Sequence, residues 1–262
     1  MSTAARAAHP IVDDPPYIFI DDAASKICRS MAASPLDYQL ANPAEPVLAA
    51  ARLSACTRAR CAADAFRASE LSQYVLLGAG LDYPVCDPSV RCWAIDLPGV
   101  LEWRTEVFAN AGMPDRCIHV PADLTGASLV PALLAADLDA DEPVFIAWLG
   151  GTMYLDRASI DAVFTELAHL RTGSVMIADF ILPATDRDGA GAAYAVALAG
   201  AIGGREPWRC TPNRDQIADM LSRAGWQDVQ QEDEDAALPV GFWDRSDSLH
   251  PMRLVNLVET HN

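Results

Sequence analysis

The chain alternates between short runs of apolar residues and longer segments in which apolar residues recur every three or four positions. Short apolar runs are typical of strands buried on both faces of a sheet, and the longer spacing is typical of amphipathic helices. Strands that alternate with helices predict an α/β domain with a mainly parallel sheet. The predicted strands lie within 73–80, 91–96, 117–124, 144–150 and 174–182, and the predicted helices within 97–112, 128–138 and 156–173.

The segments before this alternation carry other patterns. Residues 1–45 are rich in Pro, Asp and Ala and predict a partly ordered arm with short helices. Residues 46–71 have helical spacing and predict one long helix or two packed helices. We therefore expect an N-terminal arm and helical cap over 1–71, followed by a core domain over 72–262.

An alanine-rich insertion follows the fifth predicted strand. Residues 183–210 predict a loop and a helix, which would cover a site at the end of the sheet as a lid. The next helix is predicted within 211–226, with Thr211 as its N-terminal cap and Gly225 as its end. Two late strands are predicted within 228–233 and 252–261.

A glycine turn follows the first predicted strand. Its sequence, Gly78-Ala79-Gly80, begins like a dinucleotide-binding fingerprint, but Tyr83 stands where the third glycine would be. Dinucleotide sites place a pyrophosphate on the helix that opens directly after the glycines. The connection over 81–90 contains Pro84 and Pro88, which exclude such a helix here. The turn therefore favours an adenosyl or amino-acid ligand without phosphates, because glycines allow close approach of the backbone.

Acidic residues follow the second and third predicted strands. Asp96 stands where a carboxylate can accept both hydroxyls of a ribose, and Asp123 stands where one can accept an adenine amino group, with Leu124 covering the ring. Ligands of open α/β sheets bind beyond the carboxyl ends of the strands, where these residues and the glycines converge. The alternative is that both acids are solvated residues at strand ends.

Composition narrows the class of partner. The chain has 262 residues, about half of them apolar, and a formal net charge of −17, which argues against a nucleic-acid partner and against an anionic membrane surface. Its seven cysteines form no CxxC pair and no Cys/His spacing suited to zinc, so we expect no metal site. Scattered thiols, the lack of a signal peptide and the lack of a membrane-spanning run predict a cytoplasmic protein.

Five stretches occur together in the order of a known family: "VLLGAGLDYP", "AIDLPGVLEWR", "VPADL", "WLGGTMYLDRASIDAVFTELAHLRTGS" and "EPWRCTPNRDQIADMLSRAGW". Together they resemble the S-adenosylmethionine-dependent methyltransferases of the leucine carboxyl methyltransferase family, especially its bacterial natural-product branch. The resemblance runs from about residue 50 to the end. It implies a class I methyltransferase fold, which is a Rossmann-like, seven-stranded, mostly parallel sheet with helices on both faces, here with an N-terminal helical cap.

The resemblance also implies a set of residues that bind S-adenosyl-L-methionine. An arginine that holds the methionine carboxylate corresponds to Arg60, with Arg58 as the alternative. Two positions depart from the family pattern: Tyr83 replaces a threonine, and Leu149 replaces a glutamate. The other implied cofactor-binding residues are Gly78, Ala79, Gly80, Asp82, Asp96, Leu97, Asp123, Leu124 and Trp148.

The chemistry of the acceptor decides whether a general base is needed. A carboxylate is already a nucleophile, whereas a hydroxyl would benefit from a base. The candidates are Asp179, placed after the fifth strand, Tyr154 and His250, each of which could instead have a structural role. His119 and His169 look structural. Tyr194, Arg205 and Trp208 are candidate acceptor contacts in the lid.

The favoured function is an S-adenosylmethionine-dependent O-methyltransferase (EC 2.1.1.-) that acts on a carboxylate or hydroxyl of a small molecule in secondary metabolism. The first alternative is a methyltransferase-fold protein that has lost catalysis and serves as a binding or scaffold protein, an alternative that Leu149 keeps open. The second alternative is a nicotinamide-dependent oxidoreductase. The prolines in the connection over 81–90 disfavour it. The oligomeric state is left open, with a homodimer as one alternative.

Overall fold

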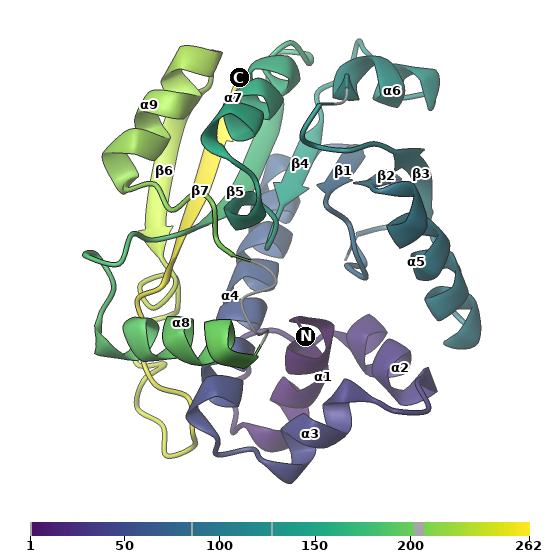
Figure 1. Cartoon of the computed structure of the whole chain (residues 1–262). Helices are drawn as coiled ribbons and strands as arrows, with labels where there is room; N and C mark the ends of the chain where they lie inside the picture. The colour runs from purple at the N-terminus through teal and green to yellow at the C-terminus, as the bar shows by residue number, and fades with distance from the viewer. Residues whose placement is uncertain (1, 85, 127, 202–206) are drawn as a thin grey trace.

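A computed structural model describes residues 2–84, 86–126, 128–201 and 207–262. Within these residues seven strands form one sheet in the order β3-β2-β1-β4-β5-β7-β6 (Figure 1). Strands β1 to β5 pair in parallel, and β7 runs antiparallel to β5 and β6. The predicted seven-stranded, mostly parallel sheet is therefore confirmed. The strands are β1 Gln73–Leu77, β2 Arg91–Asp96, β3 Cys117–Pro121, β4 Phe145–Trp148, β5 Val175–Ile181, β6 Gln227–Asp233 and β7 Val255–His261.

Helices cover both faces of this sheet. One face packs against α6, α7 and α9, and the other packs against α4 and α5. Strand β1 supplies both cores, since Val75 and Leu77 join the first and Tyr74 and Leu76 join the second. The helices are α1 Ser2–Val12, α2 Asp22–Ser30, α3 Pro35–Ala41, α4 Pro46–Ser69, α5 Pro98–Asn110, α6 Leu129–Ala135, α7 Arg157–Leu167, α8 Gly189–Ala201, α9 Arg214–Ala224 and the 3₁₀ helix η1 Thr152–Tyr154.

The order of the strands places a crevice at one end of the sheet. Strand β1 pairs with β2 on one side and with β4 on the other. The connections after β1 and after β4 therefore lead to opposite sides of the sheet centre, which leaves space beyond the carboxyl end of β1. Such a switch point is where open α/β sheets bind ligands. The carboxyl ends of the parallel strands point toward α1 and α8 (Figure 1).

The N-terminal segment contains the expected short helices, α1 to α3, but they are well packed and do not form a partly ordered arm. Helix α1 is closely packed, because alanines at positions 4, 7 and 8 are almost fully buried against α2 and α3. A fully buried ion pair ties α1 to α4, with the Arg52 Nε 2.8 Å from Asp13 Oδ2. His9 Nδ1 lies 2.8 Å from the same oxygen. The small alanine side chains, the local His9–Asp13 contact and the long-range Arg52–Asp13 ion pair order the segment.

One further local prediction needed correction, and two were confirmed. Helix α9 is capped by Asn213 and not by Thr211, since the Asn213 side chain accepts the Gln216 N–H and the Gln216 side chain accepts the Asn213 N–H. Gly225 ends this helix, as predicted, with φ of 100°. Residues 46–69 form one helix, α4.

Candidate active site

The glycine turn after β1 forms one wall of a pocket of about 250 Å³, named here the glycine-loop pocket. Gly78 and Gly80 have φ values of 63° and 46°, which favour glycine. A Cβ built on Gly78 meets no atom within 4 Å, so the backbone is open to a ligand there. The pocket is lined by Ser2, Thr3, Arg58, Gly78, Ala79, Gly80, Leu81, Asp82, Trp103, Leu149 and Gly150.

Asp96 lies beside this turn at the end of β2. Its Oδ2 accepts the Gly80 N–H at 2.9 Å, and its Oδ1 accepts the Leu97 N–H at 2.8 Å. A carboxylate oxygen can accept two hydrogen bonds, so each oxygen keeps acceptor capacity. The carboxylate is thus fixed next to Gly80 and can accept further donors; it lies beside the glycine-loop pocket and is not one of its lining residues.

The end of β3 lies next to Asp96, because the Ala122 N–H donates to the Asp96 carbonyl at 3.0 Å. Asp123 follows and is exposed, with its Oδ1 accepting the Thr125 N–H at 2.8 Å and the Thr125 hydroxyl at 2.7 Å. These bonds hold the pKa of Asp123 below its ordinary value. Leu97 is 47% exposed, and Leu124 is half-buried. Asp123 and Leu124 thus follow the end of β3, which lies beside Asp96, and none of Asp123, Leu124 and Leu97 lines the glycine-loop pocket.

Of the two candidate arginines, only Arg58 reaches this pocket. Its Nη1 lies 3.0 Å from Asp179 Oδ2, and its Nη2 donates to Ser2 Oγ at 3.2 Å. Arg60 does not line the pocket, and its Nε lies 3.3 Å from the Asp64 carboxylate one turn along α4. Burial opposes the charge of Arg58, but Asp179 outweighs it and raises the pKa of Arg58. The geometry favours the alternative, Arg58, over Arg60.

Asp179 holds this arginine in place. It lies inside β5 and not after it, is fully buried, and accepts the Gly150 N–H at 2.6 Å. Gly150 has φ of 70°, and a Cβ there would lie 3.5 Å from the Arg58 guanidinium. The Asp179 carboxylate lines neither this pocket nor the one beside it. It positions Arg58 and the Gly150 turn and is not placed to act as a base.

A second pocket, of about 390 Å³, adjoins the first and is named here the Tyr154 pocket. The two pockets share Ser2, Arg58 and Gly150. Three residues expected near an acceptor line it, namely Tyr154, Tyr194 and Trp208, whereas Arg205 lies outside the described residues. The remaining lining residues are Ala51, Ser54, Ala55, Met153, Ile181, Leu198, Leu254 and Val255.

Two of the expected site residues lie elsewhere. His250 is exposed and lines neither pocket; it contributes to a third pocket between α4 and α8. Trp148 is fully buried on the α7 side of the sheet, with its ring centroid 5.9 Å from that of Phe164. It packs in the core because successive residues of a strand face opposite sides of the sheet. The next residue, Leu149, does line the glycine-loop pocket.

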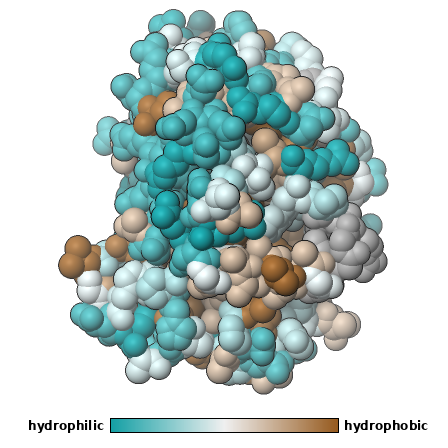
Figure 2. All heavy atoms as spheres, turned by 60° about the vertical axis from the view of Figure 1, so that its left-hand side comes forward, coloured by the Kyte–Doolittle hydropathy of each residue, from teal (hydrophilic) through white to brown (hydrophobic). Residues whose placement is uncertain are grey.

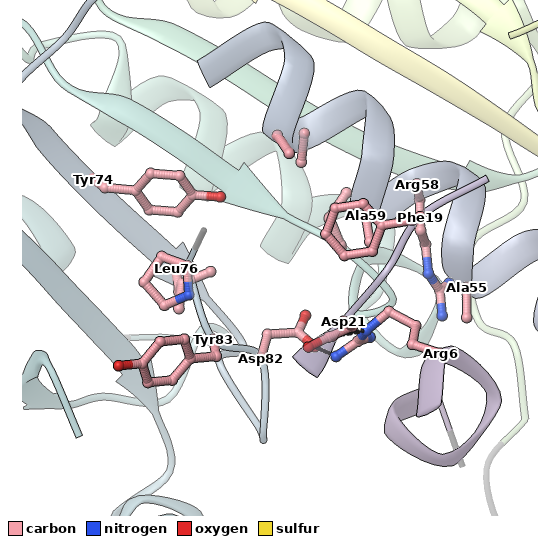
Figure 3. Close-up of a pocket in the computed structure, with 14 residues that line it drawn as sticks. Arg6, Phe19, Asp21, Ala55, Arg58, Ala59, Tyr74, Leu76, Asp82 and Tyr83 are labelled. Carbon is pink, nitrogen blue, oxygen red and sulfur yellow. Dashed lines mark hydrogen bonds and ion pairs between the residues drawn. The ribbon is translucent and has the colours of Figure 1, made fainter. Parts of the chain in front are cut away.

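Helix α1 is part of the site, which no local sequence pattern indicated. Arg6 Nε lies 2.7 Å from Asp21 Oδ2, and Arg6 Nη2 lies 2.7 Å from Asp82 Oδ1 on the glycine loop (Figure 3). Ser2, from the same helix, accepts hydrogen bonds from Arg6 and Arg58. Helix α1 therefore covers the glycine loop and is fixed to it by Arg6.

The structure also accounts for Tyr83. Its ring centroid lies 5.8 Å from that of Phe108 on α5, and it packs in a cluster with Ile27 of α2. In Figure 3 the Tyr83 side chain points away from Arg6. An aromatic side chain here anchors the glycine loop to two helices, which the threonine of the family pattern is too small to do.

The comparisons with known proteins agree with this fold. The model of the leucine carboxyl methyltransferase family matches residues 1–168. A candidate methyltransferase from Thermobifida fusca superposes with a TM-score of 0.62 at 16% identity, over 100% of this chain and 94% of that one. A DUF574-family protein from Streptomyces avermitilis gives 0.60 at 17%, over 99% and 97%. No curated protein matches the chain significantly.

A third structure is that of human N-acetylserotonin methyltransferase in complex with SAM. Its TM-score is 0.52 at 12% identity, over 86% of this chain and 58% of that one. At these identities the three structures show a shared fold. Among the described residues, no helix is long and apolar enough to cross a membrane, and no group of three His, Cys, Asp or Glu could hold a metal ion.

Proposed function

The chain belongs to the leucine carboxyl methyltransferase family, and we propose that it transfers a methyl group from S-adenosylmethionine to an oxygen atom of a small molecule. The observation that carries this proposal is the junction of the two pockets, which share Ser2, Arg58 and Gly150 at the carboxyl ends of β1 and β4. A methyl donor in one pocket and an acceptor in the other would meet at that junction. Holding two reactants in line is the main contribution that a protein makes to such a transfer.

The residues of the glycine-loop pocket fit the donor. The open backbone at Gly78 would lie against it, the remaining acceptor capacity of Asp96 suits ribose hydroxyls, and the Arg58 guanidinium suits the methionine carboxylate. Asp123, with Leu97 and Leu124, would contact the adenine. The bound donor supplies a methyl group activated by a sulfonium. Asp82 is engaged by Arg6 and would act by fixing the glycine loop.

The lining of the Tyr154 pocket favours a carboxylate acceptor. Among its described lining residues Arg58 is the one charged side chain, and no Asp, Glu or His is present. A carboxylate acceptor needs no base, which suits this lining, whereas a hydroxyl acceptor would have the Tyr154 and Tyr194 hydroxyls and the serines as its side-chain partners. Methylation of a hydroxyl remains the second candidate, with Tyr154 as its polar contact.

The proposal also covers the metabolic role, the cellular compartment and the identity of the methyl donor. The resemblance to the natural-product branch supports a role in secondary metabolism. All seven cysteines are free, which supports work in the reducing cytoplasm. The human methyltransferase solved with SAM supports the choice of donor.

Calorimetric titration with S-adenosylmethionine tests the proposal. Binding in the micromolar range, without comparable binding of NADH, is expected. No binding at about millimolar concentration would exclude the methyltransferase and favour another ligand. Donor binding without transfer of a labelled methyl group to any of a panel of carboxylic acids and phenols would favour the scaffold alternative.

A further inference from the structure

A third pocket, of about 320 Å³, lies between the first turns of α4, helix α8 and the chain around residue 250; it is named here the alanine pocket. Its lining is almost entirely apolar and short. Because alanine side chains are small, they leave room that longer side chains would fill. The lining residues are Pro46, Val47, Ala49, Ala50, Ala190, Ala193, Tyr194, Ala197, Ser248, His250 and Met252.

Helix α8 borders both this pocket and the Tyr154 pocket. Tyr194 is half-buried and lines the two pockets from this helix. Burial raises the pKa of Tyr194 to about 12, so its hydroxyl stays neutral. The Tyr194 side chain is thus a wall that the two pockets have in common.

The backbone of the chain fixes α8 at this distance from the core. A Cβ built on Gly191 would lie 2.3 Å from the Arg253 carbonyl oxygen, so the helix already touches the strand-side backbone there. This contact fixes the first turn of α8 against the segment that precedes β7.

Polarity differs between the two pockets. The residues that the Tyr154 pocket shares with the glycine-loop pocket are Ser2, Arg58 and Gly150, whereas alanine, valine, proline and methionine side chains make up most of the far pocket. On the face that Figure 2 shows, hydrophilic residues predominate in the upper half, and the lower half is a mixture that includes several apolar residues.

Building on the proposed function, we propose that the acceptor is an elongated molecule with an apolar tail. Its oxygen-bearing end lies in the Tyr154 pocket beside Arg58, and its tail passes Tyr194 into the alanine pocket. The alanine pocket is thus the subsite that selects acceptors by the length of their apolar part. Short polar acids would fill only the first of the two pockets.

The test uses a substitution that fills the pocket without changing the core. Ala193 is exposed on α8 and lines the alanine pocket, so Ala193→Trp places a large ring in it. Val196, on the same helix, is 75% exposed and lines none of the three pockets, so Val196→Trp is the matched control. The probes are straight-chain carboxylic acids of four to twelve carbons, whose binding is measured by calorimetry without any methyl donor.

The wild type and Val196→Trp should bind longer acids more tightly, by roughly threefold to fourfold for each added methylene until the pocket is full. In Ala193→Trp the gain should stop several carbons earlier. Equal chain-length dependence in both variants, or none in the wild type, would overturn the inference.

S-adenosylhomocysteine is titrated into the same proteins to separate the two claims. If it binds while chain length has no effect, the proposed function stands and the tail subsite fails. If it does not bind while the chain-length effect depends on Ala193, the subsite stands and the proposed function fails.

Discussion

Arg58 on α4 and Asp179 in β5 form an ion pair, with 3.0 Å between Nη1 and Oδ2, at the junction of the two pockets. The carboxylate is fully buried, while the guanidinium side chain stays 16% exposed and lines both pockets. A buried carboxylate that is paired and hydrogen-bonded holds its partner in one orientation. The pair therefore presents a fixed cation between the places proposed for donor and acceptor.

We expect Arg58→Lys to weaken binding of S-adenosylhomocysteine by about tenfold. Lysine keeps the charge beside Asp179 but loses the planar fork that binds a carboxylate through two hydrogen bonds. The loss is measured by isothermal titration calorimetry, with thermal unfolding as a check that the protein is folded. Arg60→Lys, two residues along the same helix, should change the affinity less than twofold. Equal losses in the two variants would contradict the assignment of Arg58.

We expect Arg6→Gln to increase the rate at which S-adenosylhomocysteine dissociates, by about tenfold. Arg6 is almost fully buried and joins α1 to Asp21 and to Asp82, so its loss should free the helix that covers the glycine-loop pocket. Stopped-flow displacement measures the rate, and Asp82→Asn should shift it in the same direction. The control is Arg67→Gln. Arg67 lies on α4, its side chain is 72% exposed, and it pairs with Asp64 of α4. A dissociation rate unchanged in both Arg6→Gln and Asp82→Asn would mean that α1 does not retain the ligand.

Glu234 is a buried carboxyl group behind the wall of the Tyr154 pocket. It is 1% exposed, and its Oε1 accepts the N–H groups of Leu254 and Val255, two residues that line that pocket. Burial raises the pKa of Glu234 to about 8, and hydrogen bonding from Ser54 and from the backbone offsets this only in part. The carboxyl is therefore mostly protonated at neutral pH.

This raised pKa makes stability depend on pH. Between the ordinary pKa of 4.5 and the folded value of about 8, the folded protein binds more protons than the unfolded chain, so the free energy of unfolding falls as pH rises through this range. A pKa that differs by one between the folded and unfolded states corresponds to about 1.4 kcal/mol, so the fall attributable to Glu234 is on the order of a few kcal/mol.

Glu234→Gln should reduce the fall in the free energy of unfolding that urea unfolding measures between about pH 5 and pH 8. The control Glu232→Gln, at an exposed position of β6 two residues before Glu234, should retain it. An identical pH dependence in wild type and Glu234→Gln would show that the carboxyl does not titrate in this range.

The parts of this structure that depend on local pattern were predictable. Strand β2 has the predicted bounds Arg91–Asp96, because a run buried on both faces has a clear apolar signal. Asp96 was placed correctly beside the glycines, because the carboxyl ends of parallel strands converge.

The parts that depend on orientation or on distant contacts were not predictable. Arg58 and Arg60 are two residues apart and lie on nearly opposite sides of α4, but the sequence does not say which side faces the sheet end. Trp148 and Leu149 are neighbours, yet one is in the core and one lines the pocket. Arg6 pairs with Asp82, 76 residues away, and no local spacing signals such a contact.

The central claim is that the glycine-loop pocket binds the methyl donor with Asp96 on its ribose, and calorimetric titration of S-adenosylhomocysteine into Asp96→Ala tests it most directly. Hydrogen bonds to a charged acceptor contribute about 1.5–3 kcal/mol, so the affinity should fall at least about tenfold relative to the wild type. Asp87→Ala is the control, since this exposed residue of the β1–β2 connection accepts hydrogen bonds from Ser89 and has no contact with the glycines. The affinity of Asp87→Ala for S-adenosylhomocysteine should equal that of the wild type. An unchanged affinity in a folded Asp96→Ala protein would contradict the account.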